Sequence, residues 1–179
     1  MRDKRVIASR AACYWMFSGS GTTSVRIVGI DPGLNLTGYG VIDAAEGRVQ
    51  LCEAGVIRNG AHKSLGERLA EIYDGVCETL RLLRPEVVAV EELYSHYREP
   101  RTAILMGHAR GVICLAAAKT GLPVVHYSAT KIKKMLTGSG RAPKEQIQRA
   151  IQRELELPQL PETPDVADAP AVALYDHYL

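Results

Sequence analysis

The chain has 179 residues, 46% of them hydrophobic and 23% charged, a composition typical of one globular domain with a complete core. Its 22 Lys and Arg residues nearly balance 20 Asp and Glu residues, so the formal net charge is only +2. No apolar run approaches the roughly 18 residues that a membrane span requires, which argues against an integral membrane protein. The four cysteines are scattered without C-x-x-C spacing, and they predict a reducing, cytoplasmic location without a zinc site.

Residues 1–24 differ in composition from the rest of the chain. Basic residues precede a short apolar run, Ala11 to Phe17, which ends in the Gly/Ser-rich segment Ser18 to Gly21. A secretory signal has similar features, but Arg10 adjoins the apolar run and the first core strand follows almost at once. We therefore expect a flexible N-terminal extension over residues 1–24, or a true start at Met16, and one folded domain over residues 25–179.

The segment Val25 to Gly40, VRIVGIDPGLNLTGYG, predicts a buried strand that ends in a carboxylate. Ile27 to Ile30 form a nearly continuous apolar run, and Pro32-Gly33 is a strong turn signal. Thr37 to Ile42 then has a second strand pattern, which predicts a hairpin. Asp31 is thus held at the end of a core strand, as a metal ligand requires, although an aspartate there would also cap the turn.

The remaining pattern predicts a mixed α/β sheet with one antiparallel region. Apolar residues recur every three or four positions in the first expected helix, as in an amphipathic helix. In the second, Gly107 and Gly111 share one face, which indicates close helix packing within the fold or in a dimer. After the hairpin, the predicted elements are strands at Val49 to Ile57, Glu86 to Val90 and Leu122 to Tyr127, and helices at Lys63 to Leu83, Pro100 to Thr120, Ala129 to Leu136, Pro143 to Leu155 and from Thr163-Pro164 onward.

The strand Glu86 to Val90 also ends in carboxylates, Glu91 and Glu92. Its continuous apolar sequence is typical of a buried strand in a parallel sheet. Because side chains alternate between the two faces of a strand, only one of these two carboxylates can point into the same site as Asp31.

Charge is unevenly distributed toward the C-terminus. Residues 128–153 carry seven basic side chains and one acidic, whereas residues 154–179 carry six acidic side chains and none that is basic. Charge runs are often solvated helix faces, but four lysines lie around Gly138-Ser139-Gly140, where backbone N–H groups can also meet phosphate. The segment therefore suggests a polyanion held beside metal-binding carboxylates. The four lysines are Lys131, Lys133, Lys134 and Lys144.

Asp165 and Asp168 lie three residues apart in the first turn of the last expected helix and share one face. Aspartate is common at helix starts for capping alone. Together with two strand-end carboxylates, however, they would satisfy two Mg²⁺ ions, because hard cations need several oxygen ligands and an ion pair can clamp a phosphodiester. Pro170 lies inside the same helix, where proline removes a backbone hydrogen bond and is expected to kink it.

From about Val25 to the C-terminus, the chain resembles the RuvC family of Holliday-junction resolvases, which have the ribonuclease H-like fold. Four segments carry the resemblance: GIDPGLNLTGYGVI, VVAVEELY, GHARGV at 107 to 112, and DVADAPAVA. It implies catalytic and metal-ligating roles for Asp31, Glu91, Asp165 and Asp168. It selects Glu91 and not Glu92 from the neighbouring pair. Lys133 and Lys144 fall where the family has basic residues needed for cleavage, and Tyr94 where it has an aromatic that stacks on junction bases.

The resemblance further implies a five-stranded mixed sheet flanked by helices, and a homodimer that nicks two opposing strands of a four-way DNA junction. The reaction would be phosphodiester hydrolysis with two Mg²⁺ ions per active site, for which Mn²⁺ can substitute. The proteins RuvA and RuvB, which drive branch migration, would be its partners in recombination and DNA repair. The expected DNA-binding residues are Tyr94, Lys131, Lys133, Lys134 and Lys144.

Two rival functions stay open on the residues alone. A strand followed by D-x-G also begins the phosphate loop of sugar-kinase and actin-like ATPases, although these proteins need two such domains and this chain is short for that. A junction-binding module without catalysis would account for the basic segment, but it has no use for four aligned carboxylates. The five histidines share no ligand spacing and are expected at ordinary surface or core positions.

Overall fold

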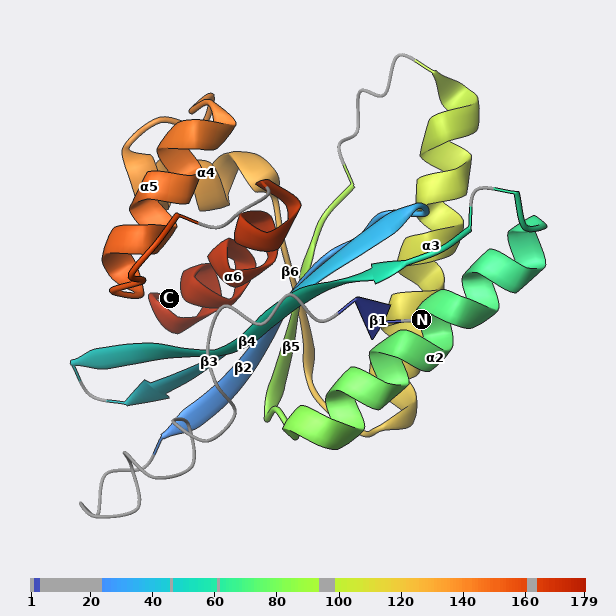
Figure 1. Ribbon diagram of the computed structural model, residues 1–179, viewed down its shortest axis with the longest axis horizontal. Coiled ribbons are helices and arrows are strands. Elements are labelled where there is room, and N and C mark those ends of the chain that lie inside the picture. The colour runs from blue at the N-terminus through green and yellow to red at the C-terminus, as the bar shows by residue number, and fades with distance from the viewer. Residues whose placement is uncertain (1, 4–23, 46, 61, 94–98, 161–163) are drawn as a thin grey trace.

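The computed structural model describes residues 2–3, 24–45, 47–60, 62–93, 99–160 and 164–179. Of Pro164 and Asp165, only the backbone is described. The chain forms a central twisted sheet with helices on both faces (Figure 1). Within these residues, no helix combines the length and the apolar character that crossing a membrane requires.

The sheet of the described residues has six strands in the order β1-β4-β3-β2-β5-β6. Strand β3 pairs with β2 and with β4, and both pairs are antiparallel. Strand β5 pairs with β2, and β6 pairs with β5, in parallel. All five predicted strands are present, so the predicted mixed sheet with one antiparallel region is confirmed. The strands are β1 (Arg2–Asp3), β2 (Val25–Asp31), β3 (Leu36–Ala45), β4 (Arg48–Arg58), β5 (Val87–Glu91) and β6 (Val124–Tyr127).

Strand β1 is a two-residue addition at the sheet edge, where Arg2 pairs with Ile57 and Asp3 with Val56 of β4. It lies within the segment expected to be an N-terminal extension. Residues 4–23, including the apolar run and Met16, lie outside the described residues, so the boundary at residue 24 stays a prediction.

Helices α2 and α3 cover one face of the sheet, and α4, α5 and α6 cover the other (Figure 1). All five lie where the sequence predicted helices, with ends that differ by no more than two residues. They are α2 (Leu65–Leu83), α3 (Pro100–Lys119), α4 (Ala129–Thr137), α5 (Lys144–Glu154) and α6 (Pro164–His177).

The first of these helices shows how local sequence sets the boundaries. Helix α2 begins after Ser64, because the Ser64 hydroxyl accepts a hydrogen bond from the Glu67 backbone N–H while the Glu67 carboxylate accepts one from the Ser64 N–H at 2.8 Å. It ends at Arg84, which adopts a left-handed conformation with φ of 49° directly before Pro85. The buried face of α2 consists of Ile72, Val76, Thr79, Leu80 and Leu83.

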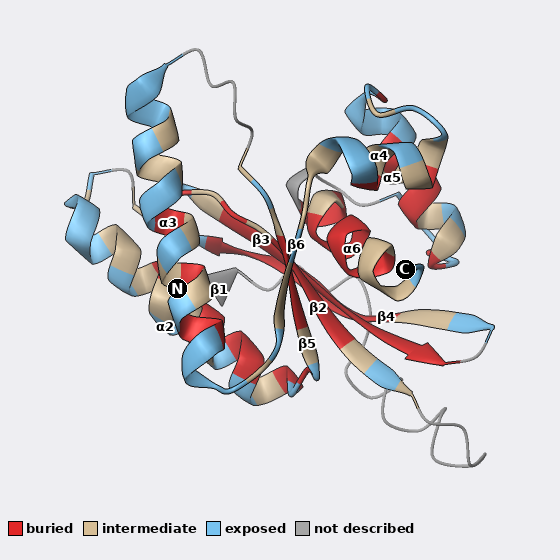
Figure 2. Ribbon diagram, turned by 180° about the vertical axis from the view of Figure 1, so that it is seen from behind, coloured by how far each residue is buried: buried red, intermediate tan, exposed pale blue. Residues whose placement is uncertain are grey.

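Alternation along the strands produces two cores, one on each face of the sheet. On β2, Ile27 packs with α4, α5 and α6, whereas Val28 and Ile30 pack with α2 and α3. The same alternation holds on β5, where Ala89 faces the α6 side and Val88 and Val90 the other. Central strand segments are therefore buried on both faces (Figure 2).

Helix α6 lies directly on the backbone of the central hairpin, at a pair of glycines. Gly29 of β2 and Gly40 of β3 are register partners. A Cβ on Gly29 would stand 2.1 Å from the carbonyl oxygen of Ala169, and a Cβ on Gly40 would stand 2.5 Å from Cγ of Pro170. Pro170, which was expected to kink the helix, lies inside α6 with its ring against Gly40, and the helix continues to His177.

Gly29→Ala is expected to destabilise the protein, because the new methyl group would meet backbone atoms that only a shift of α6 can move. Overpacking of this kind typically costs about 1 to 3 kcal/mol. Thermal unfolding should show a fall in Tm of several degrees. The matched control is Gly66→Ala on α2, where the added Cβ has no atom within 4 Å and alanine favours the helix. An unchanged Tm for Gly29→Ala would contradict the close packing.

Candidate metal centre

Two carboxylates stand next to each other at the ends of neighbouring parallel strands. The last register pair between β2 and β5 is Ile30 with Val90, and Asp31 and Glu91 follow immediately on each strand. Adjacent strands lie roughly 4.8 Å apart. The sheet therefore places the Asp31 and Glu91 backbones side by side.

The alternation of side chains decides which glutamate joins Asp31. Asp31 has the parity of Ile27 and Gly29, and Glu91 has the parity of Ala89, so both belong to the face that α6 covers. Glu92 follows β5, is exposed, and donates its backbone N–H to the carbonyl oxygen of Tyr127 at 2.8 Å. The geometry thus brings Glu91 and Asp31 together and leaves Glu92 apart.

Helix α6 brings a third carboxylate to the strand ends. Asp168 is partly buried near the N-terminal end of α6, and its Oδ2 lies 3.8 Å from Nζ of Lys144. Asp165 lies one turn earlier on the same helix, where its backbone is described and its side chain is not. The backbone of α6 therefore keeps the predicted spacing of the two aspartates.

The charges around Glu91 change the pKa of its carboxyl group. Burial raises its pKa most, the negative charges of Asp31 and Asp168 raise it further, and Lys133 and Lys144 lower it, with a result of about 8 against an ordinary value of 4.5. Side chains from β2, α4, α5 and α6 thus lie close enough to Glu91 of β5 to change its pKa. A cluster of carboxylates that cannot all ionise at low cost is a setting that a bound cation stabilises.

The four predicted lysines divide into two pairs. Lys133 and Lys144 are close enough to the carboxylates to influence Glu91. Lys131 and Lys134 are exposed on α4 and are not among the charges named as changing the pKa of Glu91. The structure therefore gathers Lys133 and Lys144 at the carboxylates and leaves Lys131 and Lys134 on the outer surface of the same helix.

The family model for the crossover junction endodeoxyribonuclease RuvC matches residues 27–176. The RuvC of Rhodopirellula baltica is 56% identical over 153 residues, which cover 86% of each chain, and that of Moorella thermoacetica is 47% identical over 83% of this chain and 88% of the relative. This chain belongs to the RuvC family.

Solved structures agree with this membership. Thermus thermophilus RuvC in complex with a Holliday junction substrate has a TM-score of 0.80 at 34% identity, covering 86% of this chain and 94% of that one. The yeast mitochondrial Holliday junction resolvase Ydc2 is only 14% identical with a TM-score of 0.61, and shares the fold. The fold is therefore the ribonuclease H-like fold of the RuvC family, and the actin-like and sugar-kinase alternative does not apply.

The residues suit the divalent metal ions that the RuvC nuclease family implies. Carboxylate oxygens are the hard ligands that Mg²⁺ and Mn²⁺ prefer. Burial, followed by the negative charges of Asp31 and Asp168, raises the pKa of Glu91, and a bound cation would offset the repulsion between these carboxylates. Among the described side chains, no three His, Cys, Asp or Glu residues converge tightly enough to hold one ion. Asp165, the fourth carboxylate, is not among these described side chains, and oxygen donors of this kind suit a divalent cation.

Sequence reasoning missed the residues that hold the loop after Asp31. The Asn59 side-chain amide donates a hydrogen bond to the carbonyl oxygen of Leu34 at 2.8 Å. The Asn59 backbone N–H donates one to the carbonyl oxygen of Asn35 at 3.1 Å. Arg68 of α2 donates to the Asn35 side chain. No local pattern links these positions, because the contacts form only when β4 and α2 fold next to the loop. Tyr94, by contrast, lies outside the described residues.

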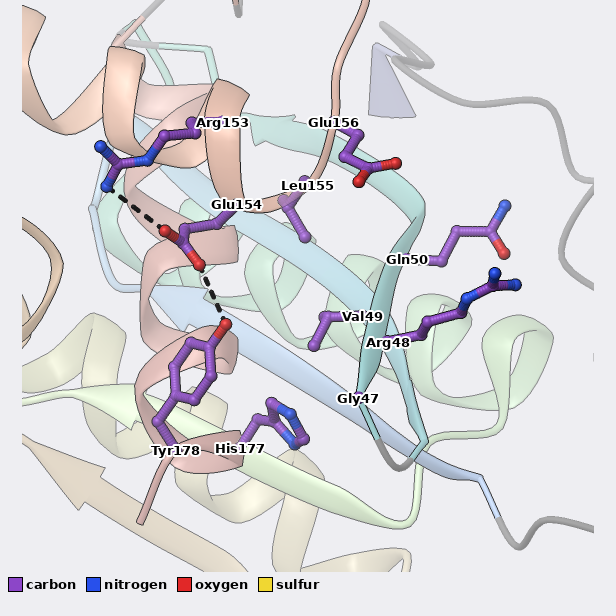
Figure 3. A pocket seen from close by; sticks show the side chains of 10 residues that line it. All are labelled: Gly47, Arg48, Val49, Gln50, Arg153, Glu154, Leu155, Glu156, His177 and Tyr178. Carbon is purple, nitrogen blue, oxygen red and sulfur yellow. Dashed lines mark hydrogen bonds and ion pairs between the residues drawn. The ribbon is translucent and has the colours of Figure 1, made fainter.

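A separate pocket lies at the opposite end of α6 (Figure 3). It has a volume of about 870 Å³ and is lined by the β3–β4 turn, the end of α5 and the C-terminal residues. Glu154 there pairs with Arg153 and accepts a hydrogen bond from the Tyr178 hydroxyl at 3.0 Å. Because Tyr178 is ten residues beyond Asp168, roughly 15 Å along the helix, this pocket is not part of the carboxylate site.

Glu91→Gln is expected to stabilise the metal-free protein at alkaline pH. Since the pKa of Glu91 is about 8 in the folded protein and near 4.5 when unfolded, the folded state binds more protons between these values. The free energy of unfolding therefore falls as pH rises through this window. Removing the charge should raise the free energy of unfolding by roughly 4 kcal/mol at pH 8.5 and by little at pH 5.

Urea unfolding with a metal chelator at pH 5 and pH 8.5 measures this gain. The exposed neighbour provides the control, since Glu92→Gln should show no difference between the two pH values. A gain from Glu91→Gln that is equal at both pH values would contradict a strained carboxylate at this position.

Proposed function

We propose that this chain is a homodimeric, Mg²⁺-dependent endonuclease that resolves four-way DNA junctions in recombination and repair. The observation that carries the proposal is the placement of Asp31 and Glu91 at the ends of neighbouring parallel strands, with Asp168, Lys133 and Lys144 close enough to change the pKa of Glu91. Family membership supports it, since the relatives are crossover junction endodeoxyribonucleases and one solved RuvC holds a Holliday junction substrate. RuvA and RuvB are the expected partners.

Asp31, Glu91, Asp165 and Asp168 would hold the metal. Two Mg²⁺ ions, or Mn²⁺ in their place, supply a Lewis acid for the leaving oxygen and an activated water. The protein's part is to keep the carboxylates rigid, because two are on strand ends and two on a helix packed against those strands. Glu91 would hold the metal as a carboxylate, so binding would be linked to loss of the proton that its raised pKa favours.

The lysines would bind the DNA backbone. Lys144 lies 3.8 Å from Asp168, with its side chain 61% exposed, so its ammonium can meet a phosphate without leaving the site. Lys133 is partly buried beside Glu91 and would act on the scissile phosphate itself. Lys131 and Lys134 are exposed on α4 and would add phosphate contacts farther out.

The exposed face of α3 supports the proposed homodimer. Ile104 is 62% exposed and Leu115 is 53% exposed, although both are large and apolar. Between them, Gly107 and Gly111 have no atom of the described residues within 4 Å of an added Cβ, so no described part of the chain packs closely on this Gly-x-x-x-Gly face. A second copy of this helix would find room for close approach there. The sequence predicted that these glycines allow close helix packing either within the fold or in a dimer, and packing in a dimer stays a prediction.

A nicking assay tests the proposed activity. Synthetic four-way junctions and linear duplexes of matching sequence are incubated with the protein, with Mg²⁺ and with a chelator. We expect paired, symmetric nicks on the junction only, and only with Mg²⁺. Junction binding without nicks would instead support the module without catalysis.

Asp31→Asn, Glu91→Gln, Asp165→Asn and Asp168→Asn should each abolish cleavage while junction binding survives. The reason is that each removes a charged oxygen from a site with few ligands, whereas the lysines still contact phosphate. Nicking and gel-shift assays give the two readouts. Glu92→Gln should keep most activity, and full activity of any one of the four variants removes that residue from the site.

Tyr94 is proposed to stack on an unpaired base at the junction centre. Because the ring provides the stacking, Tyr94→Phe should be nearly silent, whereas Tyr94→Ala should lose roughly 1 to 3 kcal/mol of interaction. The loss is expected in cleavage of intact junctions and should be smaller on junctions with unpaired bases at the crossover. Equal losses on both substrates with a lowered Tm would mean that Tyr94 packs under the loop, and Tyr97 would be tested next.

A further inference from the structure

Arg110 of α3 connects three elements at the carboxylate site. Its Nε donates a long hydrogen bond of 3.4 Å to the carbonyl oxygen of Glu91, the last residue of β5. Its Nη2 lies 2.9 Å from Nδ1 of His126 on β6. One planar guanidinium therefore ties the ends of two neighbouring strands to the helix behind them.

These contacts come at the point where both strands end. His126 is the register partner of Val90, and the Glu92 N–H to Tyr127 carbonyl bond, at 2.8 Å, joins the two strands one step farther on. Past this point, β6 leads through Ser128 into α4, which carries Lys133. Arg110 thus acts on Glu91 at the last register pair of β5 and β6, one residue beyond the last pair between β5 and β2.

Charge favours this arrangement. Arginine stays protonated at any relevant pH, so it always donates. His126 is exposed, but partial desolvation and the adjacent Arg110 charge lower its pKa. Because a guanidinium can only donate, Nδ1 of the neutral imidazole is the acceptor of this contact. Arg110 reaches the Glu91 backbone, whereas the charges that raise or lower the pKa of the Glu91 carboxyl come from Asp31, Asp168, Lys133 and Lys144.

We propose that Arg110 is a positioning residue that sets the orientation of the Glu91 carboxylate for metal binding, with His126 holding the guanidinium in place. The proposal rests on the function assigned above to Glu91 as a metal ligand. Removing groups that orient a metal ligand usually weakens metal affinity about tenfold or more. A shift of Glu91 alone would therefore appear as weaker metal binding, without loss of the fold or of DNA contacts.

Direct Mn²⁺ binding to the protein without DNA, followed by electron paramagnetic resonance, tests the proposal. For Arg110→Gln and Arg110→Lys we expect about tenfold weaker Mn²⁺ binding and a matching rise in the Mg²⁺ concentration for half-maximal nicking. Junction affinity and the oligomeric state in sedimentation should be unchanged. His126→Gln keeps an acceptor for Arg110 and should retain most Mn²⁺ affinity, whereas His126→Ala should lose part of it.

Arg81→Gln, an exposed arginine on α2, is the matched control and should behave as wild type. Unchanged Mn²⁺ affinity in both Arg110 variants would overturn the proposal, whether or not Tm falls. The proposal would also be overturned if the Arg110 variants lost nicking in proportion to a loss of junction affinity, since Arg110 would then contact DNA. The Mn²⁺ measurement needs no nuclease activity, so a wild-type protein that fails to nick junctions would refute the proposed function and leave this test intact.

Discussion

The contact between α6 and the glycines of the central hairpin is the constraint on which the site depends. With hydrogen as the side chain at Gly29 and Gly40, the helix backbone approaches the strands directly, and the Pro170 ring occupies the space above Gly40. Any larger side chain would push α6 outward. Because Asp168 is on that helix and Asp31 ends one of those strands, the same contact determines the distance between two of the acidic groups.

The acidic cluster is a local cost to the fold. Glu91 is disfavoured as an anion by its burial and by two neighbouring aspartates, and Lys133 and Lys144 offset part of these effects. The rest of the sheet holds the carboxylates in place despite this, through β2 and β5, which are buried on both faces. A site that binds cations is expected to store such repulsion, since a cation then stabilises the folded protein when it binds.

The structure also separates three surfaces with different chemistry. Asp31 and Glu91 lie at the ends of β2 and β5, and Lys133, Lys144 and Asp168 reach toward them from α4, α5 and α6. The outer face of α3 is apolar and glycine-containing, and the polar pocket near Tyr178 lies at the far end of α6 (Figure 3). Arg110 is the side chain by which α3 reaches the first of these surfaces.

Much of this architecture follows from local sequence. Apolar runs and turn residues were enough to predict five strands and five helices, because periodicity and capping act over a few neighbouring residues. The alternation of side chains also predicted that only one of Glu91 and Glu92 accompanies Asp31. Family motifs supplied the choice between them.

Tertiary structure alone decided the rest. The reason for Pro170 in α6 became visible only opposite Gly40, and the division of the lysines into an inner pair and an outer pair depends on how α4 and α5 pack. Arg110 and His126 are separated by 16 residues, and Asn59 contacts a loop 25 residues away. Contacts between distant parts of the chain have no local sequence signal, since they arise from the packing of whole elements on the sheet.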